Sequence, residues 1–201
     1  MIKVSLTAEF LFDTVNSGVA AFSSILQAGF KVNAHTGVSI RDLLCNQFDV
    51  DPDYVKDRIR TAFLDGKPVD DFDTAMVEKD ATLALSAAMP GLVGATFRKG
   101  GILAVFRGTI THAKVDSSVE DREGTVSIKL FNILAREIGL TFLKRGLMVD
   151  SDTARWFFSD PSDAFRKGCK SILVEGQDIH VDQLSQMTAS EGLVALRLMT
   201  P

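Results

Sequence analysis

Cysteine and long apolar runs are scarce in this chain, and each scarcity limits the class of protein. Only two cysteines, Cys45 and Cys169, occur among 201 residues, which excludes a disulfide-rich scaffold and favours reduced thiols in a cytoplasmic protein. No apolar run is long enough to span a bilayer, so no membrane partner is predicted. Glu9 and Asp13 interrupt the apolar N-terminal stretch, which therefore does not resemble a signal peptide.

Histidine is also scarce, and the common metal and nucleotide motifs are missing. The three histidines, His35, His112 and His180, lack the HxH or HxxxH spacing of metal ligands, so no metal site is predicted. No glycine-rich phosphate motif of the Walker or dinucleotide-binding type occurs, and no cofactor is predicted. Residues 70–80 are acidic but lack the ligand spacing of a calcium loop, and we expect them to form a solvated surface loop.

Basic charge is not in excess either. Lys and Arg number 22 against 26 Asp and Glu, and the net charge of −4 is distributed over both halves of the chain. A nucleic-acid-binding face requires clustered positive charge, so no nucleic-acid partner is predicted. The hydrophobic fraction of 46% is typical of a globular protein, and 201 residues suffice for one large domain or two small ones.

The most informative feature that the sequence does contain is an internal repeat. Residues 61–90 and 171–200 align without a gap. In each copy an apolar run meets an acidic residue and Gly, a β-branched residue follows, and an alternating apolar stretch closes the segment. Internal similarity fixes the unit of folding, so two related α+β units are predicted, each with one copy of this pattern. Their parts are Asp65-Gly66, Val69 and Leu83–Met89 in the first copy, and Glu175-Gly176, Ile179 and Leu193–Met199 in the second.

Local patterns in the first half predict a mixture of helices and strands. The best-marked helix covers Ser39–Phe48, where Ser39 is the capping residue and Asp42 completes a capping box. A second short helix opens at Asp51-Pro52. Residues 15–29 fit a loop, a hairpin or a short helix. Alternating or β-branched stretches predict strands at residues 2–12, 30–35, 59–64 and 82–88.

The second half has a similar mixture of elements. We expect an amphipathic helix over residues 132–145, ended by Gly146, and a further helix from Asp152 that stops before Pro161. Beyond the strands of the repeat, further strands are predicted at residues 102–106, 109–112 and 125–130.

Helices and strands that follow no regular β-α-β alternation predict the α+β class. We place a first domain at residues 1–97 and a second α+β domain at residues 98–201. The repeat leaves open whether the second domain is a diverged duplication of the first.

Three short motifs of the first half occur together in a known family. They are the helix start at Ser39–Leu44, the Asp65-Gly66 turn and the late strand at Lys79–Leu85. With this spacing, residues 1–91 resemble the ubiquitin-like β-grasp proteins of the sulfur-carrier type, ThiS and MoaD. The resemblance implies a small sheet that clasps one helix, and a protein partner such as an adenylating or sulfur-transfer enzyme.

One departure from this family concerns its reactive tail. Sulfur carriers act through a free C-terminal Gly-Gly, whereas this chain has Met89-Pro90-Gly91 at the corresponding place and ends in Leu198–Pro201. Proline restricts the backbone and threonine adds bulk, so the chain as it stands is not expected to carry sulfur. Cleavage after Gly101 would turn Gly100-Gly101 into a terminal diglycine, which makes a carrier precursor an alternative. Otherwise the Gly pair marks a domain junction or a tight turn.

Few side chains are candidates for chemistry. Cys169 has Arg166 and Lys167 nearby, cations that would lower its pKa and favour a thiolate nucleophile. No defined base accompanies it, so the sequence contains no catalytic constellation. The remaining candidates are His112 for catalysis, and Arg98 and Arg107, with Lys99 beside them, for binding an anion near the Gly pair.

An aromatic cluster indicates a contact surface. Trp156, Phe157 and Phe158 cannot all face the same side of a helix, so at least one is expected to be exposed while the others pack in the core. Cys45, beside the apolar stripe of its helix, is expected to be a buried structural residue.

These observations favour a non-enzymatic β-grasp protein that acts through protein–protein contacts. The sequence supplies no catalytic group, and exposed edge strands in such folds accept partners. Two alternatives stay open. One is the carrier precursor, and the other is an enzyme or small-ligand binder with a site between the two halves.

Overall fold

In a computed structural model, the helices and strands of the chain divide between two units. Residues 32–135 form one, called the middle unit here, and residues 1–31 with 136–201 form the other, called the terminal unit. The structure describes residues 4–87, 91–99, 101, 122–187 and 192–199. Both units mix helices with mostly antiparallel strands, which confirms the α+β class. The division differs from the predicted boundary at residues 97 and 98, because the N-terminal residues belong with the C-terminal third.

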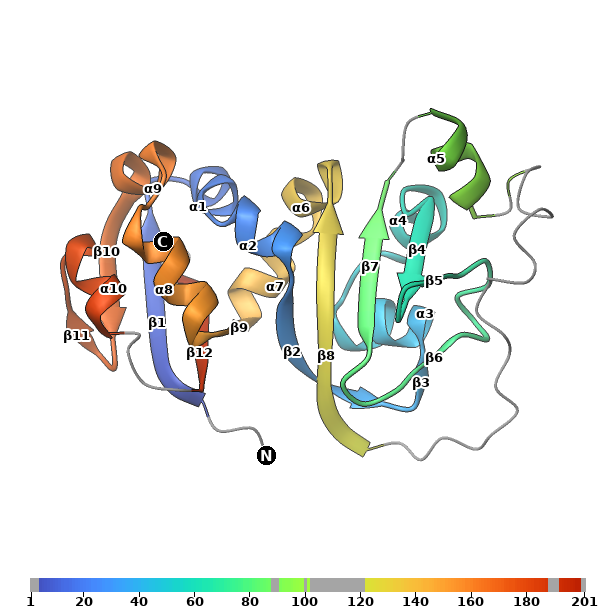
Figure 1. The fold of residues 1–201 in the computed structure, drawn as a ribbon, viewed down its shortest axis with the longest axis horizontal. Coiled ribbons are helices and arrows are strands. Elements are labelled where there is room, and N and C mark those ends of the chain that lie inside the picture. The colour runs from blue at the N-terminus through green and yellow to red at the C-terminus, as the bar shows by residue number, and fades with distance from the viewer. Residues whose placement is uncertain (1–3, 88–90, 100, 102–121, 188–191, 200–201) are drawn as a thin grey trace. The chain divides into compact units, whose positions relative to one another are not determined.

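The middle unit contains a mixed sheet in the order β2-β8-β7-β4-β5 (Figure 1). β7 and β8 run parallel, whereas β4 is antiparallel to both β7 and β5. A separate two-stranded sheet joins β3 to β6. The strands are β2 (Phe30–Thr36), β3 (Val38–Ser39), β4 (Thr61–Leu64), β5 (Lys67–Pro68), β6 (Met76–Val77), β7 (Thr82–Ser86) and β8 (Arg122–Phe131).

The predicted helix at Ser39 is present, but most of it is wound as a π-helix. The Ser39 hydroxyl accepts a hydrogen bond from the amide of Asp42 at 3.1 Å, which confirms the predicted cap of α3 (Ile40–Asp42). The chain then continues as the π-helix η1 (Leu43–Gln47), in which the Phe48 amide donates to the Leu43 carbonyl. Helix α4 (Pro52–Asp57) follows, capped by Asp51 as predicted.

One face of the middle sheet is fully buried, and the other is partly open. Residues directly opposite on neighbouring strands share a face, so Phe63, Ala84 and Lys129 lie together on the partly exposed face. Helix α5 (Gly91–Phe97) contributes Phe97, whose ring lies 5.3 Å from that of Phe63. The buried apolar residues on the strands and helices include Ile40, Leu43, Leu44, Val55, Ala62, Leu83, Leu85, Ile128 and Leu130.

In the terminal unit the strands form a mixed arrangement in the order β11-β10-β1-β12-β9. β1 (Val4–Phe12) and β12 (Leu193–Met199) run parallel at its centre. On the outside, β10 is antiparallel to β1, and β9 is antiparallel to β12. The remaining strands are β9 (Leu147–Asp150), β10 (Cys169–Val174) and β11 (Gln177–Asp178).

Residues 15–29 form two short helices, which settles an open alternative of the sequence. The helices of the terminal unit are α1 (Val15–Ala21), α2 (Ser23–Ala28), α7 (Gly139–Arg145), α8 (Ser151–Ser159), α9 (Asp163–Gly168), η3 (Val181–Gln183) and α10 (Leu184–Met187). The helix predicted over residues 132–145 is broken into α6 (Ile133–Glu137) and α7, and α7 ends at Gly146 as expected. The hairpin predicted at residues 102–112 lies outside the described residues.

Aromatic side chains build the core of the terminal unit. Phe10 stacks on Phe158 with ring centroids 5.7 Å apart and meets Phe22 edge-on at 5.0 Å. Phe165 lies against both Phe10 and Phe12 at 5.8 and 5.4 Å. Each such pair adds about 0.5–1.5 kcal/mol to the stabilisation from burial, so this cluster holds β1 to α1, α8 and α9.

The repeated turn has the same geometry in both units. Asp65-Gly66 and Glu175-Gly176 all adopt positive φ, a backbone conformation that Gly reaches without strain. The Val69 amide donates to the Ala62 carbonyl at 2.9 Å. Likewise, the Ile179 amide donates to the Ile172 carbonyl at 2.9 Å. The sequence repeat therefore corresponds to equivalent hairpins, β4-β5 and β10-β11.

The strand that follows each hairpin does not take the equivalent place. In the middle unit the Asp65 carboxylate accepts a hydrogen bond from the Thr82 amide of β7 at 2.7 Å. In the terminal unit the Glu175 carboxylate accepts one from the Thr7 amide of β1 at 2.7 Å. β12, the counterpart of β7 in the sequence repeat, is separated from β10 by β1. The two copies of the repeat therefore agree in the hairpin and differ in the place of the closing strand.

None of the helices in the described part of the chain has the length and apolar character that a bilayer crossing requires.

Candidate functional site

A cluster of charged residues surrounds Phe72 in the middle unit, and we call it the Phe72 cluster. It consists of Phe72, Arg41, Arg60, Asp73 and Lys99. Phe72 is only 2% exposed, so the acidic segment predicted as a surface loop is anchored by a buried ring. Backbone bonds bring the cluster together, because the Arg41 amide donates to the Phe72 carbonyl at 3.0 Å and the Lys99 amide to the Arg60 carbonyl at 2.7 Å.

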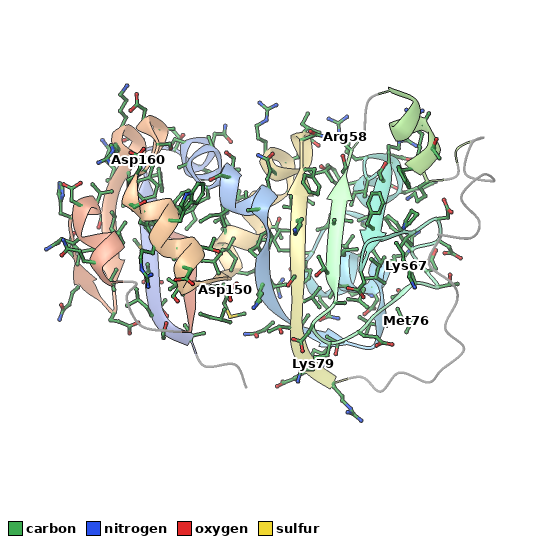
Figure 2. All side chains as sticks on the ribbon, viewed as in Figure 1. Arg58, Lys67, Met76, Lys79, Asp150 and Asp160 are labelled. Carbon is green, nitrogen blue, oxygen red and sulfur yellow. The ribbon has the colours of Figure 1, made fainter. Side chains whose placement is uncertain are left out.

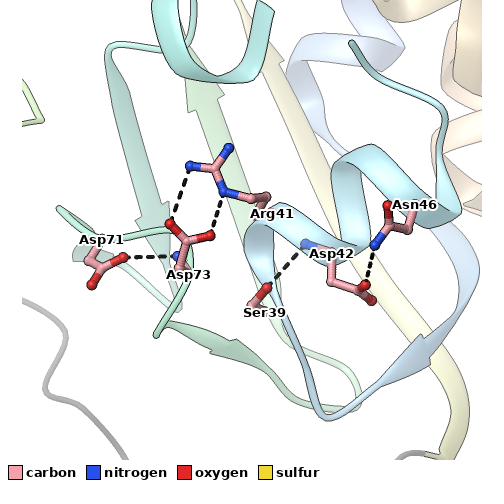
Figure 3. A network of polar contacts seen from close by, with 6 residues as sticks. All are labelled: Ser39, Arg41, Asp42, Asn46, Asp71 and Asp73. Atoms are coloured by element: carbon pink, nitrogen blue, oxygen red, sulfur yellow. Dashed lines mark hydrogen bonds and ion pairs between the residues drawn. The ribbon is translucent and has the colours of Figure 1, made fainter. Parts of the chain in front are cut away.

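Arg41 and Asp73 form a two-pronged ion pair within this cluster (Figure 3). The Nε and Nη2 atoms of Arg41 donate to the two carboxylate oxygens of Asp73, the second at 3.3 Å. The hydrogen bond to Asp73 raises the pKa of Arg41 above its ordinary value. The Asp71 carboxylate accepts a hydrogen bond from the backbone amide of Asp73 at 2.9 Å. This bond holds the backbone of Asp73 next to Arg41.

Lys99 lies just beyond α5 and rests on the ring of Phe72. Its Nζ atom is 4.1 Å from the ring centroid, within the range of a cation–π contact. Burial lowers the pKa of the Lys99 ammonium, and the neighbouring charges of Arg41 and Arg60 lower it further. Asp57 and Asp73 act in the opposite direction but do not cancel the shift. A partly buried ammonium therefore lies near two guanidinium groups in this cluster.

A second polar network holds the start of the Ser39 helix and is structural. Asp42 accepts a hydrogen bond from the Asn46 amide group at 2.6 Å, one helical turn away (Figure 3). Cys45 lies between them on η1 as a half-buried free thiol, and burial raises its pKa. A raised pKa keeps the thiol neutral, in line with the structural role expected for Cys45.

Cys169 is not activated by the cations that precede it in the chain. Burial raises the pKa of its thiol from 9.0 to about 11. Arg166 is paired with Asp160 and Asp182, and Lys167 with Asp163. The thiol donates to the Ser171 carbonyl at 3.6 Å and stays protonated at neutral pH, which opposes a role as nucleophile.

The remaining predicted site residues lie around the end of α5 or outside the described residues. Arg98 is exposed and directly precedes Lys99. The Gly101 amide donates to the Arg98 carbonyl at 3.0 Å, and a Cβ atom at Gly101 would lie 3.1 Å from that oxygen, so this Gly fits a tight turn. His112, Arg107 and Gly100 lie outside the described residues. Within the described ranges, no group of His, Cys, Asp and Glu is arranged to hold a metal ion.

Most members of the Phe72 cluster could not be found from the sequence. Arg41, Arg60, Phe72 and Lys99 come from four separate segments, and no motif spacing joins them. The run of Arg98 and Lys99 beside the Gly pair was the only local signal, and it indicated an anion without indicating the other cations.

Trp156 is the most exposed large apolar side chain in the described part of the chain. It is 71% exposed on α8, whereas its neighbours Phe157 and Phe158 are 6% and 2% exposed. The expectation that at least one of the three aromatic residues faces solvent is confirmed. Because Phe157 and Phe158 stack into the aromatic core, the backbone of α8 that carries Trp156 is held in place.

Comparison with known proteins finds no family model, no curated protein and no solved structure that matches the chain.

Proposed function

We propose that both units are β-grasp sheets and that the protein acts by binding another protein. A β-grasp sheet places its first and last strands side by side and parallel, with a hairpin on one flank and the strand before the helix on the other. In the middle unit, the parallel pair β8 and β7, the hairpin β4-β5 and the strand β2 before α3 support this reading. β8 would be the first strand of the grasp, although it comes last in the unit.

The terminal unit supports a related reading and a diverged duplication, with its first and last strands in interchanged places relative to the middle unit. Its parallel pair β12 and β1 lies between the hairpin β10-β11 and the strand β9 before α8. When β3 and β6 of the first half and η3 and α10 of the second are left aside, and α3 and η1 are counted as one segment, both halves follow one order of elements. This order is a strand, two helices, a strand, two helical segments, a hairpin and a closing strand. In this reading the first strands have been exchanged, because β1 lies with β9–β12 and β8 lies with β2–β7.

This exchange weighs against a sulfur-carrier precursor. Cleavage after Gly101 would leave β8 on one fragment and the rest of its sheet on the other. The place of Gly101 in a turn after α5 also differs from the free tail that a carrier needs.

Trp156 is the observation that supports protein binding most directly. Tryptophan is strongly enriched among the residues that dominate binding energy at protein interfaces. The indole is 71% exposed and has only two side-chain torsions, so it offers a large contact area at a low cost in conformational entropy. We therefore propose α8 as the contact surface, with an adenylating or sulfur-transfer enzyme as the class of partner that the β-grasp resemblance implies.

A photo-crosslinking amino acid at position 156, incorporated in the native host, tests the proposal. We expect a discrete adduct with one protein. The same substitution at Lys67 on β5, an exposed residue of the middle unit, serves as the matched control and should give none (Figure 2). The purified partner should shift the emission of Trp156, the only tryptophan, to shorter wavelength. An adduct pattern that is the same at both positions, or no adduct at either, would refute the proposal.

A further inference from the structure

We propose that Lys99 and Arg60, with Arg41 beside them, form a binding site for a phosphate group in the middle unit. The three cations come from different segments: Arg41 from α3, Arg60 from the residue before β4, and Lys99 from the residues that follow α5. Two backbone hydrogen bonds and the contact of Lys99 with Phe72 hold these segments together. The backbone segments that carry the three cations are therefore held together by the fold before any ligand arrives.

No described residue neutralises the charge of Lys99 by direct contact. The buried ring of Phe72 occupies one side of its ammonium. No ion pair or side-chain hydrogen bond of Lys99 occurs within the part of the chain that the structure describes. A partly desolvated ammonium without a counterion is unfavourable, and the lowered pKa of Lys99 reflects that cost. A bound anion would remove it.

Arg60 and Arg41 differ in how they are available to such an anion. Arg60 is exposed, and its side chain makes no hydrogen bond or ion pair with the described residues. Arg41 already pairs with Asp73, which fixes its guanidinium and compensates its charge. Because Arg41 and Asp73 neutralise each other, the remaining charges near Lys99 are its own, that of Arg60 and the opposite charge of Asp57. Their sum is positive.

A phosphate group fits this arrangement better than a single carboxylate. A phosphate monoester has up to two negative charges and three free oxygens, so it can accept hydrogen bonds from cations that approach from different directions. Arginine donates to phosphate through paired N–H groups, and lysine adds a compact point charge. Inorganic phosphate is therefore the first probe, and acetate is the comparison for a carboxylate.

The test follows the side-chain NMR signals of the lysines in the full-length chain during titration with inorganic phosphate at constant ionic strength. We expect a saturable shift of the Lys99 signal and a rise in its pKa, because a nearby anion favours the charged ammonium. Acetate should produce a shift at least tenfold weaker. If sodium chloride at equal ionic strength reproduces the phosphate shift, simple screening is sufficient and the proposal is wrong.

Variants decide which residues hold the phosphate. Arg60→Gln and Lys99→Gln should each lower the phosphate affinity at least tenfold, read from the Lys99 signal in the first and from the amide signals around Phe72 in the second. Lys67→Gln, a charge loss on the outer strand β5, should leave it unchanged. Circular dichroism confirms that each variant is folded. Equal affinity in all three variants, or no saturable shift in the parent chain, would overturn the proposal.

Discussion

Burial governs the chemistry of two residues in this protein, in opposite directions. It raises the pKa of the Cys169 thiol and lowers the pKa of the Lys99 ammonium, because in both cases a partly dry site disfavours the charged form. The sequence predicted the opposite shift for Cys169, because the nearby Arg166 and Lys167 would lower the pKa of its thiol. In the folded protein both cations form ion pairs with carboxylates instead, so the thiol stays protonated.

The raised pKa of Cys169 predicts a loss of stability in alkaline solution. Below about pH 9 the thiol is neutral in both the folded and the unfolded chain, whereas between pH 9 and pH 11 it ionises only in the unfolded chain. The free energy of unfolding should therefore fall across that window, by on the order of 1 kcal/mol after allowance for partial exposure. Urea unfolding of the parent chain and Cys169→Ala at each pH measures the difference. A difference that is flat from pH 8 to about pH 11 would contradict it.

At the scale of single elements, the π-helix η1 is joined to β2 through Gln47. The side-chain oxygen of Gln47 accepts from the His35 amide at 2.8 Å, and its side-chain nitrogen donates to the His35 carbonyl at 3.0 Å. A π-helix turns its residues differently from an α-helix, so the winding of η1 decides where Gln47 points. The predicted α-helix over Ser39–Phe48 had the right position and cap but could not indicate this contact.

Replacement of Gln47 by Ala should destabilise the protein by about 1 kcal/mol. The variant loses both hydrogen bonds with β2. The expected loss of stability is at the low end for two hydrogen bonds, because both are close to solvent. Asn46→Ala is the matched control, since within the described residues the Asn46 side chain bonds only the side chain of Asp42, one turn earlier. Urea unfolding gives the free energies, and hydrogen exchange should speed up at the His35 amide in the first variant alone. Equal losses in both variants would show that Gln47 has no special role.

At the scale of the whole molecule, the place of β1 among the C-terminal strands makes the two halves of the chain depend on each other. β1 lies between β12 and β10 in the terminal unit, and β8 lies beside β7 in the middle unit. Burial of Phe10 and Phe12 on β1 stabilises the terminal unit by about 3–6 kcal/mol. This is comparable with the entire stability of a small domain, so the terminal unit cannot fold without the N-terminal strand.

Cleavage of the folded chain between Gly101 and Ile102 should therefore leave both fragments in one folded particle. A protease site inserted there, followed by size-exclusion chromatography and circular dichroism, measures this. The fragments should co-elute with unchanged secondary structure and separate only in denaturant. A protease site placed after Pro201 is the control for the insertion and the digestion. Separation into two independently folded fragments would contradict the exchange and would restore the domain boundary predicted between residues 97 and 98.

Residue patterns settled the local features of this protein because local forces determine them. The caps at Ser39 and Asp51, the end of α7 at Gly146 and the turns at Asp65-Gly66 and Glu175-Gly176 each depend on side chains within a few residues. The α+β class and the exposure of one residue in the cluster from Trp156 to Phe158 also follow from the pattern of apolar residues.

Only the tertiary structure decided which strands meet and which charges gather. β12 and β7 match in sequence, yet the first lies next to β1 and β9 and the second next to β4 and β8, because an apolar strand can pair with any strand of suitable length and exposed edge. The Phe72 cluster likewise depends on long-range packing, which brings Arg41, Arg60 and Lys99 around one ring. Hydrophobic burial is not directional, so sequence pattern alone leaves these partners unspecified.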